Sequence, residues 1–141
     1  MPQFSALLPV FAQDEALHRV LESIDHGESG CVVAPAGARI PLIASMAQRR
    51  DKTIYVVVPT GREAEETASA LRAWVEDVEV FPSWETLPHE RLSPQVDTMA
   101  QRIAVLRRLI HPQSGDEHAG ALNVVVIPVR ALMQPIIHGI A

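Results

Sequence analysis

The stretch between Gly30 and Ala47 constrains the fold more than any other part of the chain. A short apolar run at residues 31–34 predicts a strand, residues 35–38 predict a tight turn, and apolar residues at helical spacing then predict a helix. A strand that leads through a loop of small residues into a helix is the arrangement in which P-loop proteins hold phosphate. Phosphate binding is therefore the first function that the sequence raises.

The residue types that would hold phosphate are missing from this turn. The motif G-x-x-x-x-G-K-S/T needs glycines for close backbone approach, a lysine for the outer phosphates and a hydroxyl for magnesium. In the register that fits best, those four positions hold Ala34, Arg39, Ile40 and Pro41. Gly37 keeps the turn flexible, and a proline suits the first turn of a helix. The scaffold is predicted to persist without its chemistry, with Arg39 as an alternative cation in place of the lysine.

Composition favours a single soluble domain. The 141 residues are 48% hydrophobic and 21% charged, which suits a chain with a real core. The one cysteine excludes a disulfide framework, and the apolar neighbours of Cys31 predict a buried structural thiol. We expect a cytoplasmic protein, because the sequence shows no signal peptide and no apolar run near the roughly 20 residues that span a bilayer. The net charge of -5 argues against a direct DNA-binding module.

Strand-like and helix-like segments alternate along the chain. Continuous apolar runs at residues 53–59 and 123–128 are typical of strands covered on both faces, and residues 78–81 form a third strand candidate. This alternation predicts the α/β class, with a mostly parallel sheet and helices on both of its faces. Combined with the turn at residues 35–38, it predicts a degenerate P-loop fold.

Capping residues mark where the helices are expected to begin. Asp14 precedes one apolar stripe, and Thr60 with Glu63 has the spacing of a capping box. Asp97 precedes a longer amphipathic stretch, whose four regularly spaced apolar residues are predicted to face the core. These four are Met99, Ile103, Leu106 and Ile110. The arginines within residues 102–108 are expected to complement the dipole at the end of this helix.

The proline-rich segment at residues 82–94 carries aromatic and charged side chains. Trp84 is predicted either to pack within the chain or to contact a partner, whereas Trp74 is expected in the core. The segment and its surroundings also hold the residue types of a metal site, namely Glu85, His89, Glu90 and Asp97. A metal site is disfavoured, because His89 stands alone between prolines and metal ligands usually converge from rigid elements.

Two classes of enzyme lack their sequence signatures. A serine hydrolase would place its nucleophile in G-x-S-x-G, and no serine of this chain lies in that motif. An ATPase would place an acidic residue at the end of a buried strand to organise magnesium. The run at residues 124–127 ends instead in Pro128. We therefore expect no catalytic residue, no cofactor and no metal in this chain.

The run FPSWETLPHERLSP at residues 81–94, followed by Asp97 and the pair Gln101 and Arg102, resembles the N-terminal region of bacterial transcription-repair coupling factors. The agreement extends to the degenerate turn within residues 33–47 and to residues 125–134, so it covers nearly the whole chain. That region is in turn similar to the first domain of the excision-repair protein UvrB, which has a working Walker motif at the equivalent turn. The resemblance implies a UvrB-like domain at residues 1–128 and the start of an inserted domain at residues 129–141.

The resemblance also implies a function. Proteins of this family act in transcription-coupled nucleotide excision repair, as ATP-dependent DNA translocases that displace stalled RNA polymerase and recruit UvrA. ATP and magnesium are then expected only in a downstream motor, and RNA polymerase and DNA only at downstream modules. The UvrA contact is expected mostly in the inserted domain, so no UvrA-contacting residue is assigned here. This chain would be a non-catalytic scaffold and interaction module.

The sequence leaves one alternative function and predicts one further property. The alternative is the ATP-binding domain of a UvrB-type, helicase-like excision repair subunit, which the loss of the lysine and hydroxyl at Ile40 and Pro41 disfavours. In the family, the first domain is completed by strands that return after the insertion, and this chain runs to Ala141 without a stop signal. We therefore expect a fragment with an uncovered sheet edge, exposed apolar surface and concentration-dependent self-association.

Overall fold

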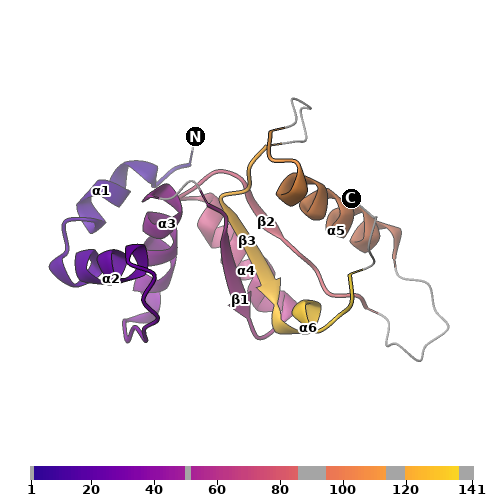
Figure 1. The fold of residues 1–141 in the computed structure, drawn as a ribbon, viewed down its shortest axis with the longest axis horizontal. Helices are drawn as coiled ribbons and strands as arrows, with labels where there is room; N and C mark the ends of the chain where they lie inside the picture. Colours follow the sequence, from indigo (N-terminus) through magenta and orange to yellow (C-terminus); the bar gives the residue numbers. More distant parts are fainter. Residues whose placement is uncertain (1, 50–51, 86–94, 114–119, 137–141) are drawn as a thin grey trace.

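The computed structural model describes residues 2–49, 52–85, 95–113 and 120–136, and the ribbon in Figure 1 follows them from one end to the other. Two short 3-10 turns, six helices and three strands make up the described part. In chain order they are η1 (Ser5–Leu7), α1 (Leu8–Phe11), α2 (Glu15–Asp25), η2 (Ala36–Ala38), α3 (Arg39–Arg49), β1 (Ile54–Val58), α4 (Gly61–Arg72), β2 (Val78–Val80), α5 (Val96–Ile110), β3 (Val124–Pro128) and α6 (Val129–Leu132).

The three strands form one parallel sheet in the order β1-β3-β2. The last strand in sequence is therefore the central one, and all five of its residues are buried. Helix α4 packs on one face of this sheet and α5 on the other, while α3 lies between the sheet and the pair α1 and α2 (Figure 1). The predicted α/β class, with a parallel sheet and helices on both faces, is confirmed.

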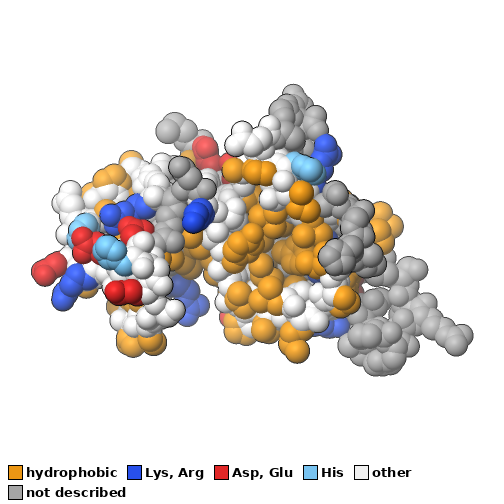
Figure 2. Space-filling model, viewed as in Figure 1, with side chains coloured by type: hydrophobic (Ala, Val, Ile, Leu, Met, Phe, Trp, Pro, Cys, Tyr) orange, Lys and Arg blue, Asp and Glu red, His pale blue; other side chains and the backbone are white. Residues whose placement is uncertain are grey.

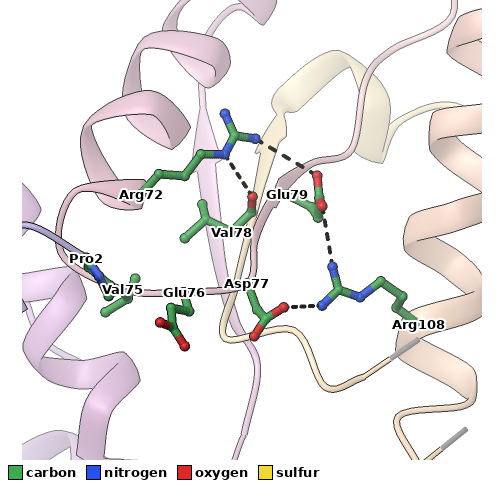
Figure 3. Close-up of a pocket in the computed structure, with 8 residues that line it drawn as sticks. All are labelled: Pro2, Arg72, Val75, Glu76, Asp77, Val78, Glu79 and Arg108. Atoms are coloured by element: carbon green, nitrogen blue, oxygen red, sulfur yellow. Dashed lines mark hydrogen bonds and ion pairs between the residues drawn. The ribbon is translucent and has the colours of Figure 1, made fainter. Parts of the chain in front are cut away.

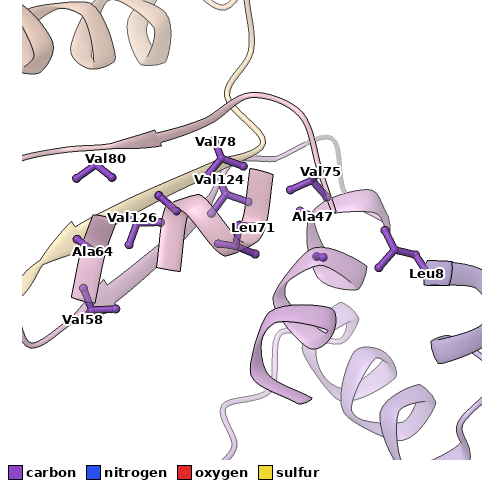
Figure 4. Packing of buried hydrophobic residues seen from close by; sticks show 12 residues of the cluster. Leu8, Ala47, Val58, Ala64, Leu71, Val75, Val78, Val80, Val124 and Val126 are labelled. Carbon is purple, nitrogen blue, oxygen red and sulfur yellow. The ribbon is translucent and has the colours of Figure 1, made fainter. Parts of the chain in front are cut away.

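The larger core lies between the sheet and α4, and it continues to α3 and α1. Side chains of Ala64, Ala68 and Leu71 on α4 are fully buried, and Figure 4 shows this helix turned toward Val124 and Val126 of β3. The short side chains of α4 let the helix approach the sheet closely, because its two alanines lie where larger residues would hold it away. At the far end of the cluster, Leu8 joins α1 to α3.

A smaller core lies on the opposite face, under α5. It contains Phe81 just after β2 and Val105 of α5. It also contains Val125 and Ile127, the residues of β3 that point to this face of the sheet. Residues of one strand point alternately to the two faces of a sheet, so β3 supplies both cores. This double burial explains why its sequence is uninterrupted by polar residues.

Two of the three predicted caps form as expected. The Asp14 side chain accepts a hydrogen bond from the backbone N–H of Leu17, at 2.9 Å, and Thr60 accepts one from Glu63 at 3.1 Å. Asp97 does not cap the third long helix, since α5 begins at Val96 and its N-cap residue is Gln95. Asp97 lies in the first turn, where a carboxylate still complements the helix dipole.

The strand predicted at residues 31–34 is wrong. These residues have no regular structure, and Val33 is 96% exposed. Cys31 is exposed as well, so the prediction of a buried thiol is also wrong. A run of four apolar residues becomes a strand only where it pairs with another strand, and neither of the described strand pairings involves residues 31–34.

Two predictions of burial also need correction. The run at residues 53–59 does form β1, but this strand is covered on one face only, and Tyr55 and Val57 are exposed. On α5, the buried residues are Thr98, Arg102 and Val105. Of the predicted apolar stripe, Leu106 packs against the smaller core as expected, whereas Met99, Ile103 and Ile110 are exposed. The helix is rotated by about one residue from the orientation that the apolar periodicity favours.

Candidate functional site

Of the strand, turn and helix expected at the predicted phosphate site, the turn and the helix form and the strand does not. Residues Ala36–Ala38 form a 3-10 turn that leads directly into α3, as the sequence predicts. Ala34, Gly37 and Arg39 are exposed. Ile40 is half-buried against the larger core, and Pro41 is buried. The two positions at which a phosphate site needs a lysine and a hydroxyl therefore contribute to packing.

An apolar cavity of about 390 Å³ adjoins this turn. It lies among α2, the extended residues 32–35 and the first turns of α3, with Leu17, Val20 and Pro41 in its lining. Its described lining holds one charged residue, Asp14, whose carboxylate accepts the capping hydrogen bond from Leu17. A cavity of this composition offers a phosphate group no cation, and its one charge repels phosphate.

A second cavity of about 380 Å³ contains two arginines, which Figure 3 shows on opposite sides of β2. Arg108 donates to Glu79 at 3.3 Å and to Asp77, while Arg72 donates to the carbonyl of Val78 at 3.2 Å and lies 3.9 Å from Glu79. Both cations thus already face carboxylates of the same chain. The arrangement ties α4 and α5 to the start of β2, and it leaves little positive charge for an anionic ligand.

The most closely knit polar cluster surrounds Trp84, after the end of β2. The guanidinium of Arg102, on α5, stacks between two rings, with its central carbon 4.2 Å from the Phe81 centroid and 4.4 Å from that of Trp84. Arg102 also donates to the carbonyl of Pro82 at 2.6 Å. From the other side, Gln134 accepts from the Trp84 backbone N–H at 2.7 Å and donates to its carbonyl at 3.3 Å.

This cluster bears on the two alternatives for Trp84. The ring is half-buried and packs within the chain, which is the first alternative, and a role in contacting a partner stays a prediction. Trp74 is half-buried against the larger core and makes ring contacts with Phe4 and Phe11, at centroid distances of 5.3 and 5.6 Å. Its expected packing role is therefore confirmed.

The carboxylate of Glu85 extends the cluster toward solvent. It accepts a hydrogen bond from the hydroxyl of Thr98, and this bond is the main reason that the pKa of Glu85 lies below its usual value. Burial lowers the pKa of Arg102, because the charged guanidinium loses solvation. Of the four candidate metal ligands, His89 and Glu90 lie outside the described residues. Among the residues that the structure describes, no three His, Cys, Asp or Glu side chains come close enough together to hold a metal ion.

Sequence reasoning missed two members of this cluster. Arg102 was expected to complement a helix dipole, and it is instead 3% exposed between aromatic rings. Gln134 gave no signal at all, because a glutamine that bonds to a distant backbone looks like any other polar residue. One signal could have indicated that Arg102 is buried: its spacing places it on the same helical face as Thr98 and Val105.

The described residues form a parallel α/β domain, and at the predicted phosphate turn Ile40 and Pro41 pack within the chain. In sequence, the chain is similar to transcription-repair-coupling factors. It is 50% identical to that of Mycobacterium tuberculosis (strain CDC 1551 / Oshkosh) over 106 residues, which are 74% of this chain and 8% of that relative. It is 29% identical to the Haemophilus influenzae protein over 111 residues and 27% identical to the Escherichia coli protein over 94 residues.

These matches cover 78% and 66% of this chain, and 9% and 8% of the two relatives. The relationship to transcription-repair coupling factors expected from the sequence is confirmed. The chain spans less than a tenth of the length of the curated relatives that it matches. No family model matches the chain. None of the described helices is long and apolar enough to cross a membrane.

Proposed function

We propose that this chain is a non-catalytic, N-terminal interaction module of a transcription-coupled nucleotide excision repair factor. The observation that carries the proposal is the 50% identity to a transcription-repair-coupling factor in a chain whose predicted phosphate turn has Ile40 and Pro41 at the decisive positions. Both side chains pack against other parts of the chain, so this turn is used for stability. A parallel α/β domain in which this turn serves packing suits a docking role.

The whole protein would carry its activity elsewhere. In the proposed arrangement, a downstream motor binds ATP and magnesium, translocates on DNA and displaces stalled RNA polymerase. UvrA is recruited mainly through the domain that follows residue 128, and the boundary between residues 1–128 and 129–141 belongs to the same proposal. The charge of the chain agrees with this division, because a net charge of -5 does not favour contact with a phosphate backbone.

Calorimetric titration of magnesium-ATP into the chain tests the central claim. We expect no binding heat up to millimolar nucleotide, because the cavity beside the turn is apolar and holds the carboxylate of Asp14. Stoichiometric binding would contradict the proposal and favour the ATP-binding domain of a UvrB-type, helicase-like subunit. The variant Arg39→Ala then separates two causes of binding. If it abolishes binding, the exposed Arg39 supplies the missing cation; if binding persists, the register assigned to Ala34 through Pro41 is wrong.

A partner measurement tests the interaction role itself. UvrA is expected to bind a longer protein that continues into the inserted domain and to bind the 141-residue chain much more weakly. If the 141-residue chain binds UvrA as tightly as the longer protein, the contact lies within residues 1–141 and not mainly in the rest of the inserted domain. If neither protein binds UvrA, the proposed role in recruitment is wrong.

A further inference from the structure

Residues 129–136 follow the central strand β3, and we call them the arm. Two side chains hold the arm to the domain: Ala131 is 1% exposed in the smaller core, and Gln134 bonds to Trp84. The large apolar side chains of the arm face solvent instead, and Val129, Leu132, Met133 and Ile136 are 46%, 55%, 83% and 54% exposed. Figure 2 shows hydrophobic surface over the strands and α6, in the middle of the view. Burial of large apolar groups therefore contributes little to holding the arm in place.

Gln134 pairs with Trp84 in the way that a neighbouring strand would. Its Oε1 accepts from the Trp84 backbone N–H at 2.7 Å, and its Nε2 donates to the Trp84 carbonyl at 3.3 Å. A carboxamide has both an acceptor and donors, so it can satisfy both backbone groups of one residue. Nearer to β2, Phe81 donates to the carbonyl of Val126 in the sheet, at 2.9 Å. The backbone of Trp84 bonds instead to a side chain 50 residues away.

Trp84 links this bonded pair to a buried cation. Its backbone is held by Gln134, while its ring lies 4.4 Å from the guanidinium carbon of Arg102. The other ring over Arg102 belongs to Phe81, which its bond to the sheet keeps in place. Arg102 is 3% exposed. A movement of Trp84 alone would therefore uncover one side of the guanidinium and leave the sheet intact.

We propose that Gln134 is a latch, through which the position of the arm controls the exposure of Trp84 and Arg102. With the latch closed, the Trp84 ring covers the guanidinium. When the arm moves away, both bonds to Trp84 break, the ring leaves Arg102, and α5 presents a cation to solvent. The coupling acts in both directions, because a coupling free energy between two contacts is reciprocal. Access of a partner to Trp84 then depends on the arm, and this last step alone rests on the proposed function.

Hydrogen exchange of single amides, followed by NMR on the whole chain, tests the latch. Gln134→Met keeps the length of the side chain and loses both bonds. We expect it to raise the exchange rate of the Trp84 amide at least about tenfold. The Phe81 amide should keep its rate, because its bond lies within the sheet. The matched control is Gln48→Met, which makes the same replacement at an exposed glutamine of α3 and should change neither amide.

Chemical modification tests whether the latch also covers the cation. Phenylglyoxal attaches to accessible guanidinium groups, and mass spectrometry locates the modified arginine. Arg102 is expected to react at least about tenfold faster in Gln134→Met than in the chain without a substitution. Arg62 is the internal reference, because its side chain is 88% exposed and should react at the same rate in both.

Several outcomes would overturn the latch. An unchanged exchange rate at Trp84, or an unchanged reaction of Arg102, means that Gln134 does not control them. Equal loss of protection at Phe81 means that the whole fold opens. If circular dichroism shows that Gln134→Met is unfolded, Gln134→Asn replaces it, because the shorter amide cannot make both bonds; loss of the fold in both variants also overturns the proposal. UvrA is absent from these measurements, so the latch and the proposed function fail independently.

Discussion

The guanidinium of Arg102 lies 4.4 Å from the centroid of the Trp84 ring and is almost completely buried. A buried cation is costly unless its charge is compensated, and here two aromatic faces and the Pro82 carbonyl supply the compensation. The pair joins α5 to the chain that leaves β2, across 18 residues of sequence. It therefore holds residues 81–84, which follow β2, against α5.

Replacing Arg102 tests how much this pair stabilises the fold. Arg102→Met keeps an apolar side chain of similar length, but it loses the stacking and leaves the Pro82 carbonyl without its donor. We expect the free energy of unfolding to fall by about 2 to 3 kcal/mol, measured by urea denaturation. Arg62→Met is the control, because Arg62 is exposed and its removal should cost less than about 0.5 kcal/mol. Equal stability of the two variants would contradict the assignment.

The bond between Thr98 and Glu85 predicts a dependence of stability on pH. The pKa of Glu85 is lower in the folded chain than in the unfolded one, so the unfolded state binds more protons as the pH falls. The stabilisation is thus complete above the unfolded pKa, about 4.3, and it is lost as the pH falls through the folded value. Thr98→Val removes the hydroxyl, and its destabilising effect should be larger at pH 7 than at pH 3. A difference that is the same at both pH values would contradict this account.

Local signals in the sequence predicted local structure well. The run that forms β3, the cap at Thr60 and the turn at Ala36–Ala38 were all predicted from neighbouring residues, because each depends on backbone preferences or on a bond over three positions. The orientation of α5 was not. Its apolar stripe has the better periodicity, yet the face with Arg102 is buried, because the compensating rings of Phe81 and Trp84 lie elsewhere in the chain.

For the candidate sites too, local patterns were predictable and contacts between distant parts of the chain were not. The loss of the phosphate ligands is readable at Ile40 and Pro41, because that motif is short and each of its positions has one task. The strand predicted at residues 31–34 is wrong, since strand formation depends on pairing with a strand that is distant in sequence, which no local pattern reveals. The contact of Gln134 with Trp84 spans 50 residues and could not be predicted from either sequence context.

The backbone of Asp77 gives a prediction about strain. This residue has φ of 53°, a left-handed conformation that disfavours side chains other than Asp and Asn, and its carboxylate pairs with Arg108. Asp77→Gly and Asp77→Ala both remove the ion pair, so their difference isolates the backbone. We expect the alanine variant to be less stable than the glycine variant by about 1 kcal/mol in urea denaturation. If the two are equally stable, the left-handed conformation is not imposed by the fold.

The exposure of Cys31 can be tested by its reactivity toward a disulfide reagent such as Ellman's reagent. The sequence predicted a buried thiol, whereas the structure places Cys31 on an extended, exposed segment beside Val32 and Val33. The single thiol should therefore react in the native chain at a rate within about tenfold of that in denaturant, because no opening of the fold is needed. A native rate slower by several orders of magnitude would mean that this segment is covered. The strand predicted at residues 31–34 would then regain support, and Val32 and Val33 would no longer line the apolar cavity beside the turn.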